Sequence, residues 1–377
     1  MEQYRQEQLC DQTKRQDTRQ TMIQVLMCGN HPTNRGGMTS VISQIREHDW
    51  EKEGVNLRFI PTYLPGNPLA KTAFFIRAYL RIRQVMINDR PEILHVHMSY
   101  KGSFTRASYL HRLCKKYGVK DIIHLHGSEF EKWYNASSES KKRKIKALLA
   151  ECGAVIVLGE SWKHVVSAIE PSANVIVISN GVEIPDTCVH WDPDICRMLY
   201  LGVLIPRKGL GDLLAAIRML KERGDLGNRK LVIAGSGEEE EQLKARTREL
   251  GLTDEVSFAG WVDGEKKAAL IKSSQVLISP SYNEGLPVSI LEAASYGMPI
   301  VSTDVGDISS VVRDGENGVL IKPGQVREMA EGILAVTQEE TFERMSRLSR
   351  KIAEESFSIG LFYDRLNRLY HQIAGSV

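Results

Sequence analysis

The chain has 377 residues, of which 42% are hydrophobic and 25% charged, and its formal net charge at pH 7 is +2. This composition is ordinary for a globular protein and excludes a disordered, collagen-like or disulfide-stapled chain. No run of 18 apolar residues occurs, which excludes a membrane-spanning helix, and the length favours two domains.

The beginning of the chain is polar. Residues 1–20 lack the apolar core of a signal peptide and are predicted to form a disordered tail. The six cysteines of the chain form no C-x-x-C pair, which favours reduced thiols in a cytoplasmic protein.

Short apolar, β-branched runs alternate with helical patterns from residue 21 onward. Runs of this kind between helices are typical of buried parallel strands. They occupy residues 21–29, 55–63, 92–98, 121–126, 154–159, 174–179, 197–204, 230–237, 255–261, 275–281, 298–304 and 318–323. Five or six strands in each half predict an α/β protein with two Rossmann-like, doubly wound sheets. The predicted domains are residues 21–187 and 188–356, joined by a proline-containing linker at 181–196.

The charge is divided unevenly between these halves. Residues 1–187 contain 26 basic and 19 acidic side chains, whereas residues 188–377 contain 23 basic and 28 acidic ones. A basic first half favours an anionic partner, either nucleic acid or an anionic membrane surface. An excess of this size also fits a surface whose charge serves only solubility.

Two predicted loops of the first half carry candidate binding residues. Gly36 and Gly37 follow the first strand and open a helix, which allows a ligand phosphate to approach the backbone. They do not form the dinucleotide-binding fingerprint. His126 follows another strand and is a candidate cleft residue.

Four histidines alternate along two predicted strands. They are His95, His97, His124 and His126. Such residues can ligate a metal or can be hydrogen-bonded core histidines, and no cysteine stands at ligand spacing. No metal site is therefore expected.

In the second half, Arg207 and Lys208 lie in a turn after a strand. An adjacent guanidinium and ammonium suit a diphosphate, although a solvated basic turn has the same sequence. Gly235 and Ser236 follow the next strand, and the four acidic residues after Gly237 favour a nucleoside pocket there over a pyrophosphate site.

The most informative stretch is residues 281–307. Pro287 is placed as the first residue of a helix, where its missing N–H costs nothing. The backbone N–H groups of Gly285 and Leu286 just before it can bind an anion, with the helix dipole behind them.

Two carboxylates belong to the same stretch. Glu284 in the loop would face sugar hydroxyls, because a carboxylate repels phosphate, and Glu292 in the helix could accept hydrogen bonds from a ribose. Acidic residues also favour helix starts, so a helix cap and a solvated side chain are the alternatives.

Taken together, these residues resemble glycosyltransferase family 4, whose members have the GT-B fold. The most specific element is the E-x7-E pattern of Glu284 and Glu292 within EGLPVSILEAASYGMPIVST. The Gly-Gly loop, HLHGSEF, ISNGVEIP and RKG occur in the family's order. The resemblance covers nearly the whole chain after residue 20.

This resemblance implies a retaining glycosyltransferase that takes a hexose-type sugar from a nucleotide-sugar donor, with UDP as the expected nucleotide. It also implies that the last helix, within residues 357–377, packs back on the first domain. The residues expected at the catalytic centre are His126, Glu284, Lys208 and Arg207. The residues expected to bind the donor are Gly36, Gly37, Gly235, Ser236, Gly285, Leu286 and Glu292. No cofactor or metal is expected.

Two positions depart from the family's pattern. Val203 stands after Gly202 where many members have arginine, so that Arg207 is expected to supply the guanidinium. Asp307 follows Gly306 where many members have a second glycine, and is expected to alter the fit of donor or acceptor.

The basic first half is expected to face the acceptor. Residues 71–86 and 141–146 combine basic with apolar side chains, as membrane-surface helices do, although a helix with its apolar face in the core shows the same pattern. The expected partner is a glycan or polyprenyl-diphosphate-linked acceptor of capsule, exopolysaccharide or O-antigen assembly at the inner membrane face, and not nucleic acid. A nucleotide-sugar epimerase of the same fold and a non-catalytic binding protein are the alternatives.

Overall fold

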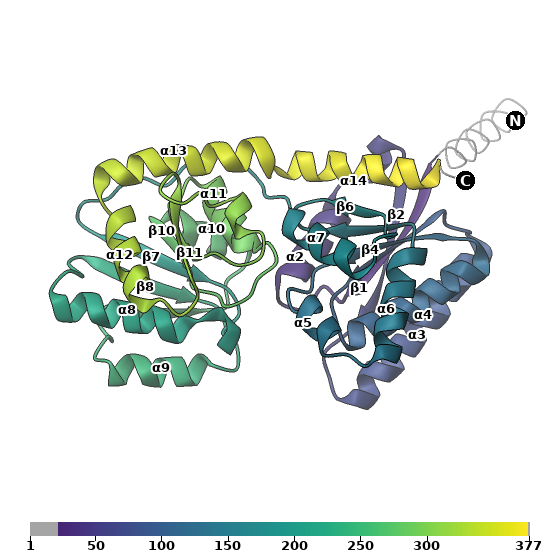
Figure 1. The fold of residues 1–377 in the computed structure, drawn as a ribbon. Coiled ribbons are helices and arrows are strands. Elements are labelled where there is room, and N and C mark those ends of the chain that lie inside the picture. Colours follow the sequence, from purple (N-terminus) through teal and green to yellow (C-terminus); the bar gives the residue numbers. More distant parts are fainter. Residues whose placement is uncertain (1–21, 376–377) are drawn as a thin grey trace, which may run out of the picture.

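The computed structural model describes residues 22–375 and places them in two lobes that lie side by side (Figure 1). Each lobe is a six-stranded parallel sheet flanked by helices. The tail predicted over residues 1–20 lies outside the described residues.

The N-terminal sheet has the strand order β2-β1-β3-β4-β5-β6. Its strands are β1 (Ile23–Asn30), β2 (Val55–Tyr63), β3 (Ile93–Met98), β4 (Lys120–Leu125), β5 (Ala154–Val157) and β6 (Val175–Val177). The helices of this lobe are α2 (Gly37–Glu47), α3 (Pro68–Asn88), α4 (Gly102–Tyr117), α5 (Phe130–Asn135), α6 (Glu139–Glu151) and α7 (Glu160–Ile169), with a 3-10 turn η1 (Trp50–Glu53).

The C-terminal sheet has the order β12-β11-β10-β7-β8-β9. Its strands are β7 (Cys196–Leu201), β8 (Arg229–Ala234), β9 (Val256–Gly260), β10 (Val276–Ser279), β11 (Ile300–Thr303) and β12 (Gly318–Ile321). The helices of this lobe are α8 (Leu210–Arg223), α9 (Glu240–Glu249), α10 (Gly264–Lys272), α11 (Val288–Ser295) and α12 (Val326–Val336), with 3-10 turns η2 (Pro206–Lys208) and η3 (Ile308–Ser310).

The twelve apolar runs each coincide with one of these strands to within a few residues, which confirms the prediction of two doubly wound parallel sheets. The central strands explain why the runs lack alternation. Every residue of β3, β5, β10 and β11 is buried, because helices cover both faces of a parallel sheet. None of the helices within residues 22–375 is long and apolar enough to cross a lipid bilayer.

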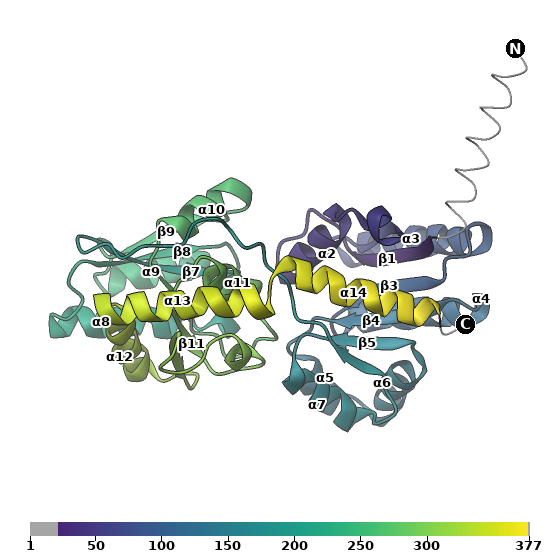
Figure 2. The same cartoon turned by 90° about the horizontal axis from the view of Figure 1, so that it is seen from above.

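The chain returns to its first lobe at the end. Helix α13 (Glu339–Ser356) lies along the C-terminal lobe, and α14 (Ile359–Ala374) continues in the same direction over the N-terminal lobe (Figure 2). Phe362, Leu366 and Tyr370 of α14 are buried in one cluster with residues of β1, β3, β4 and β5. Between α13 and α14, the backbone of Val182 forms hydrogen bonds with Phe357 and Ile359, each 2.8 Å long.

Candidate functional site

A cavity of about 540 Å³ lies between the two lobes. Both lobes line it with loops that follow the carboxyl ends of their strands. In the C-terminal sheet β7 lies between β10 and β8, so the connections after β7 and β10 run to opposite sides and leave a crevice. Doubly wound sheets bind ligands at this point of reversal.

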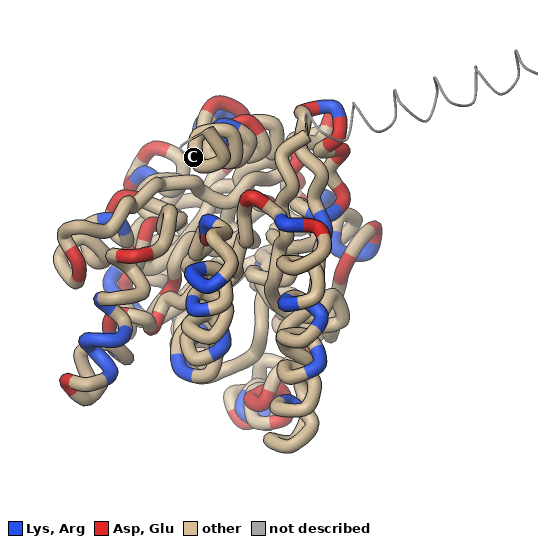
Figure 3. Tube along the Cα trace, turned by 90° about the vertical axis from the view of Figure 1, so that its right-hand side faces the viewer, with Lys and Arg blue, Asp and Glu red and all other residues tan. Residues whose placement is uncertain are grey.

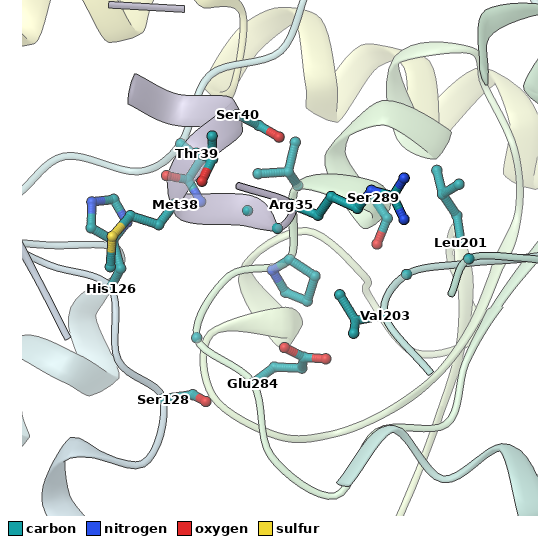
Figure 4. Close-up of a pocket in the computed structure, with 18 of the residues that line it drawn as sticks. Arg35, Met38, Thr39, Ser40, His126, Ser128, Leu201, Val203, Glu284 and Ser289 are labelled. Atoms are coloured by element: carbon teal, nitrogen blue, oxygen red, sulfur yellow. The ribbon is translucent and has the colours of Figure 1, made fainter. Parts of the chain in front are cut away.

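Two helices begin beside each other at this cavity. Gly37 and Val288 are the first residues of α2 and α11, and both line it. The position that a Cβ of Gly37 would take is 3.9 Å from the Val288 side chain. Figure 4 shows the start of α2, with Met38 and Thr39, opposite the loop that carries Glu284. Unpaired N–H groups and the helix dipoles make such a pair of helix starts favourable for an anion.

The start of α11 differs by one residue from the prediction. Pro287 holds extended backbone angles and caps the helix from outside, whereas the sequence pattern predicts it as the first helical residue. Gly285, Leu286 and Pro287 nevertheless line the cavity. The position of Pro287 still costs no helical hydrogen bond, since the residues at a helix start have no partner for their N–H groups.

Arg207 and Lys208 converge on Glu284. The Lys208 ammonium forms an ion pair with the buried Glu284 carboxylate, and the Arg207 guanidinium is 3.6 Å from its other oxygen. The Ser281 hydroxyl donates to Glu284 over 2.7 Å, and Arg207 donates to the Asn283 carbonyl over 2.7 Å. The cluster carries two positive charges and one negative charge, so it retains attraction for an anion that approaches from the cavity.

The neighbouring strands explain why residues 76 positions apart in sequence meet. β7 and β10 pair in parallel and end at the same edge of the sheet. Arg207 follows β7 and Glu284 follows β10, so both loops open onto the cavity. Val203 also lines the cavity, at the position where many members of the resembled family have arginine.

Glu292 and Gly235 line the C-terminal side of the cavity, whereas Ser236 does not. Glu292 forms an ion pair with Lys267 of α10, which also lines the cavity. A Cβ at Gly235 would lie 1.8 Å from the Gly202 carbonyl oxygen, so only glycine allows these two strand ends to approach.

The predicted N-terminal residues Gly36, Gly37 and His126 all line the cavity. His126 belongs to a stack of four imidazoles and hydrogen-bonds His97 over 2.8 Å. Burial lowers the pKa of His126 to about 3, so this imidazole is neutral at pH 7. It can therefore exchange hydrogen bonds with a ligand, but it does not supply a positive charge there.

The other histidines lie behind His126. His95, His97 and His124 are buried, with potential ligand atoms within 4.8 Å of one another. Burial, and after it the repulsion from a protonated His126, lowers the pKa of His95 to about 3. Burial also lowers the pKa values of His97 and His124 well below 6.5. His95 hydrogen-bonds the Tyr370 hydroxyl of α14 over 2.7 Å. These contacts fit the core-histidine alternative.

Sequence reasoning missed one residue that reaches across the cavity. Arg35 precedes the Gly-Gly pair, and its guanidinium donates to the Ser236 hydroxyl over 3.0 Å. It also lies over the Trp261 ring, 5.1 Å from the centroid. Figure 4 shows Arg35 extending from the N-terminal loop toward the C-terminal residues. Its position directly before Gly36, in the loop already singled out for phosphate binding, was the one sequence feature that could have indicated this role.

Asp307 lies outside the group of residues that line the cavity. Its buried side chain instead contacts the start of α7 in the N-terminal lobe, where one carboxylate oxygen accepts the Ser161 N–H over 2.9 Å. The expectation that Asp307 alters the ligand fit directly therefore has no contact to support it.

Family models match both lobes of the chain. The model "Glycosyltransferase Family 4" matches residues 25–184, and the model "Glycosyl transferases group 1" matches residues 193–355. The two matches meet in the segment between β6 and β7, where the chain passes from one sheet to the other.

Curated relatives are similar over most of their length. The amylovoran biosynthesis glycosyltransferase AmsK of Erwinia amylovora is 26% identical over 77% of this chain and 73% of its own. The UDP-Gal:alpha-D-GlcNAc-diphosphoundecaprenol alpha-1,3-galactosyltransferase of Escherichia coli is 23% identical over 85% of both chains. Among solved structures, a sucrose-phosphate synthase from Thermosynechococcus elongatus has the same fold, with a TM-score of 0.80 at 17% identity over 94% of this chain and 100% of its own.

Proposed function

Because the chain belongs to the group 1 and family 4 glycosyltransferases of GT-B fold, we propose that it transfers a hexose-type sugar from a UDP-sugar, with retention at the anomeric carbon. The acceptor is a glycan or a polyprenyl-diphosphate-linked glycan of capsule, exopolysaccharide or O-antigen assembly. The similarity to a galactosyltransferase named for a UDP-sugar and a diphosphoundecaprenol acceptor supports this choice of substrates.

The observation that carries the proposal is the convergence of positive groups on the cavity. The starts of α2 and α11 meet there, with Arg207 and Lys208 beside them. A nucleotide-sugar donor has a diphosphate whose negative charge increases as the bond to the sugar breaks. Fixed cations and helix dipoles at that position stabilise the transition state more than the ground state.

The remaining residues are assigned by their positions around that diphosphate. The Glu284 carboxylate accepts hydrogen bonds from hydroxyl groups of the transferred sugar, and the Glu292 carboxylate accepts them from the ribose. His126 lies across the cavity as a neutral hydrogen-bonding group beside the sugar. Gly36, Gly37 and Gly235 allow the backbone to approach the donor.

The proposed reaction is a substitution at the anomeric carbon. The bond from that carbon to the diphosphate oxygen breaks, and its electron pair stays with the nucleotide. An acceptor hydroxyl attacks from the same side, which gives retention, and the departing phosphate oxygen takes its proton. Arg207 and Lys208 neutralise the charge that a divalent metal ion neutralises in other enzymes.

The outer face of the N-terminal lobe supports acceptor binding at an anionic membrane. Leu69, Ile76, Leu80 and Ile87 are exposed on α3, and their spacing of seven, four and seven residues places them on one side of the helix. Basic residues lie along the helices of this face (Figure 3). An apolar stripe among basic side chains fits peripheral contact with anionic lipid, on the cytoplasmic side.

The decisive experiment combines purified protein with UDP-, GDP- and ADP-sugars, with and without a polyprenyl-diphosphate-linked glycan. We expect free UDP to appear only when the acceptor is present, with an α-linked product from an α-linked donor. Turnover of the donor without acceptor would favour an epimerase, and binding without turnover would favour a non-catalytic protein. EDTA should leave the rate unchanged, and an EDTA-sensitive rate would contradict the metal-independent mechanism.

Membrane contact is tested separately by flotation with vesicles of neutral or anionic phospholipid at low salt. We expect the protein to float with the anionic vesicles. The double variant that combines Ile76→Ser with Leu80→Ser should float less, because it removes two apolar side chains from the stripe. Equal recovery of this variant and the original protein would contradict a role for the α3 stripe.

A further inference from the structure

Asp307 joins the two lobes and does not itself line the cavity. Its carboxylate oxygen Oδ1 accepts the Ser161 N–H in the first turn of α7, over 2.9 Å. Its own backbone N–H donates to the Gly285 carbonyl over 3.0 Å. One residue of the C-terminal lobe therefore links a helix of the N-terminal lobe to the loop that precedes α11.

The start of α7 is shaped to receive this carboxylate. Gly159 caps α7, and a Cβ there would lie 2.1 Å from Asp307 Cγ. Its φ of −167° is extended backbone open to any residue, so the close approach of Asp307 explains the glycine. The helix dipole favours a negative charge at this end of α7.

A second contact between the lobes holds the same loop. The Asn180 amide donates to the Leu286 carbonyl over 2.9 Å. The Leu158 side chain lies 3.4 Å from the position of a Gly285 Cβ. The Leu286 carbonyl is thus held directly by the other lobe, and the Gly285 carbonyl is held by the residue whose carboxylate lies on α7.

We propose that Asp307 is a positioning residue that couples the placement of the two lobes to the geometry of the loop 284–286. When its carboxylate lies at the start of α7, Glu284 and the start of α11 are held in the positions that they need for the proposed sugar transfer. The inference rests on the proposed function for its effect on turnover. Its structural part, the coupling between the Asp307 contact and lobe placement, stands independently of the reaction.

The test compares Asp307→Gly with Gly159→Ala, which keeps Asp307 but occupies the space of its carboxylate. We expect both variants to have a larger radius of gyration by small-angle X-ray scattering. Both should also lose about tenfold or more in kcat, since a small misplacement of catalytic groups costs up to about 10²-fold. The dissociation constant for UDP should rise by no more than about fivefold, because a change in lobe placement moves the exposed Arg35 away from the ligand, whereas Arg207, Lys208 and Glu292 stay together on one lobe.

The double variant provides the sharpest comparison. The three atoms nearest to the methyl group that Gly159→Ala introduces all belong to the Asp307 carboxylate, so in the absence of that carboxylate this substitution should add little to the effect of Asp307→Gly. Asp307→Asn keeps an oxygen that can accept the Ser161 N–H and should recover part of kcat. Asp304→Asn, at an exposed position in the same loop, is the matched control and should behave as the original protein.

The result that would overturn the proposal is an unchanged radius of gyration and kcat in Gly159→Ala, or additive losses in the double variant. Binding stoichiometry for UDP near one per chain shows that a variant is folded. If the original protein transfers no sugar, the proposed function fails, while scattering still decides whether Asp307 sets the placement of the lobes.

Discussion

The two lobes bring the carboxyl ends of their parallel strands to one cavity, yet they place different chemistry there. The C-terminal lobe contributes the charged residues Arg207, Lys208, Glu284 and Glu292. The N-terminal lobe contributes glycines at a helix start and a neutral, half-buried imidazole, His126. The charges that the proposed anionic donor requires therefore lie mainly on one lobe, and the other lobe faces them mainly with uncharged groups.

The largest effect is expected when the charged lobe loses the ammonium of Lys208. We expect Lys208→Ala to lower kcat by about 10²–10³, the usual loss for one preorganised transition-state donor. Glu284 keeps the Ser281 hydroxyl and the nearby Arg207, so folding should persist by circular dichroism. Lys266→Ala, an exposed lysine of α10, is the control. A kcat of Lys208→Ala equal to that of the original protein would refute the role of Lys208 at the proposed diphosphate site.

A second test concerns the neutral imidazoles of the other lobe. The pKa values of His95 and His126 fall to about 3 in the folded chain, from an ordinary 6.5. Below pH 6.5 the unfolded chain binds protons that the folded chain rejects, so stability is lost as pH falls from 6.5 toward 3. Each such histidine should lower the free energy of unfolding by about 1.4 kcal/mol per pH unit.

Urea unfolding at pH 7, 6 and 5 measures this loss. His95→Gln should be less stable at pH 7 but should lose less stability on acidification. His164→Gln, at an exposed position of α7, should keep the original slope. A free energy of unfolding that stays constant from pH 7 to pH 5 would contradict neutral, buried histidines.

The smallest effect is expected at Arg35, the cation that the N-terminal lobe adds to the cavity lining. Arg35 is exposed, so its charge is screened, and we expect Arg35→Ala to weaken UDP binding only about two- to fivefold. Calorimetry at low salt measures the effect, which should shrink at high salt. Arg46→Ala, near the other end of α2, is the control. A loss as large as that of Lys208→Ala would show that both lobes grip the anion.

Particular residues show how far the sequence could predict the site. The Arg-Lys pair and the E-x7-E stretch follow strands, and strand order places loops after β7 and β10 at one cavity. Arg35 was missed because its partners Ser236 and Trp261 lie in the other lobe, about two hundred positions away. A contact of that kind leaves no local periodicity or motif.

Local patterns in the chain were enough to define the twelve strands, their division into two sheets and the residues that carry charge, because burial on both faces and helix starts leave a signature within a few neighbouring positions. The contacts between the lobes could be read only from the folded molecule. There Asp307 lies at the start of α7 and not at the ligand cavity, and Arg35 of the N-terminal lobe donates to the Ser236 hydroxyl of the C-terminal lobe. These contacts depend on how two separately formed sheets pack together, and that packing is a property of the whole chain.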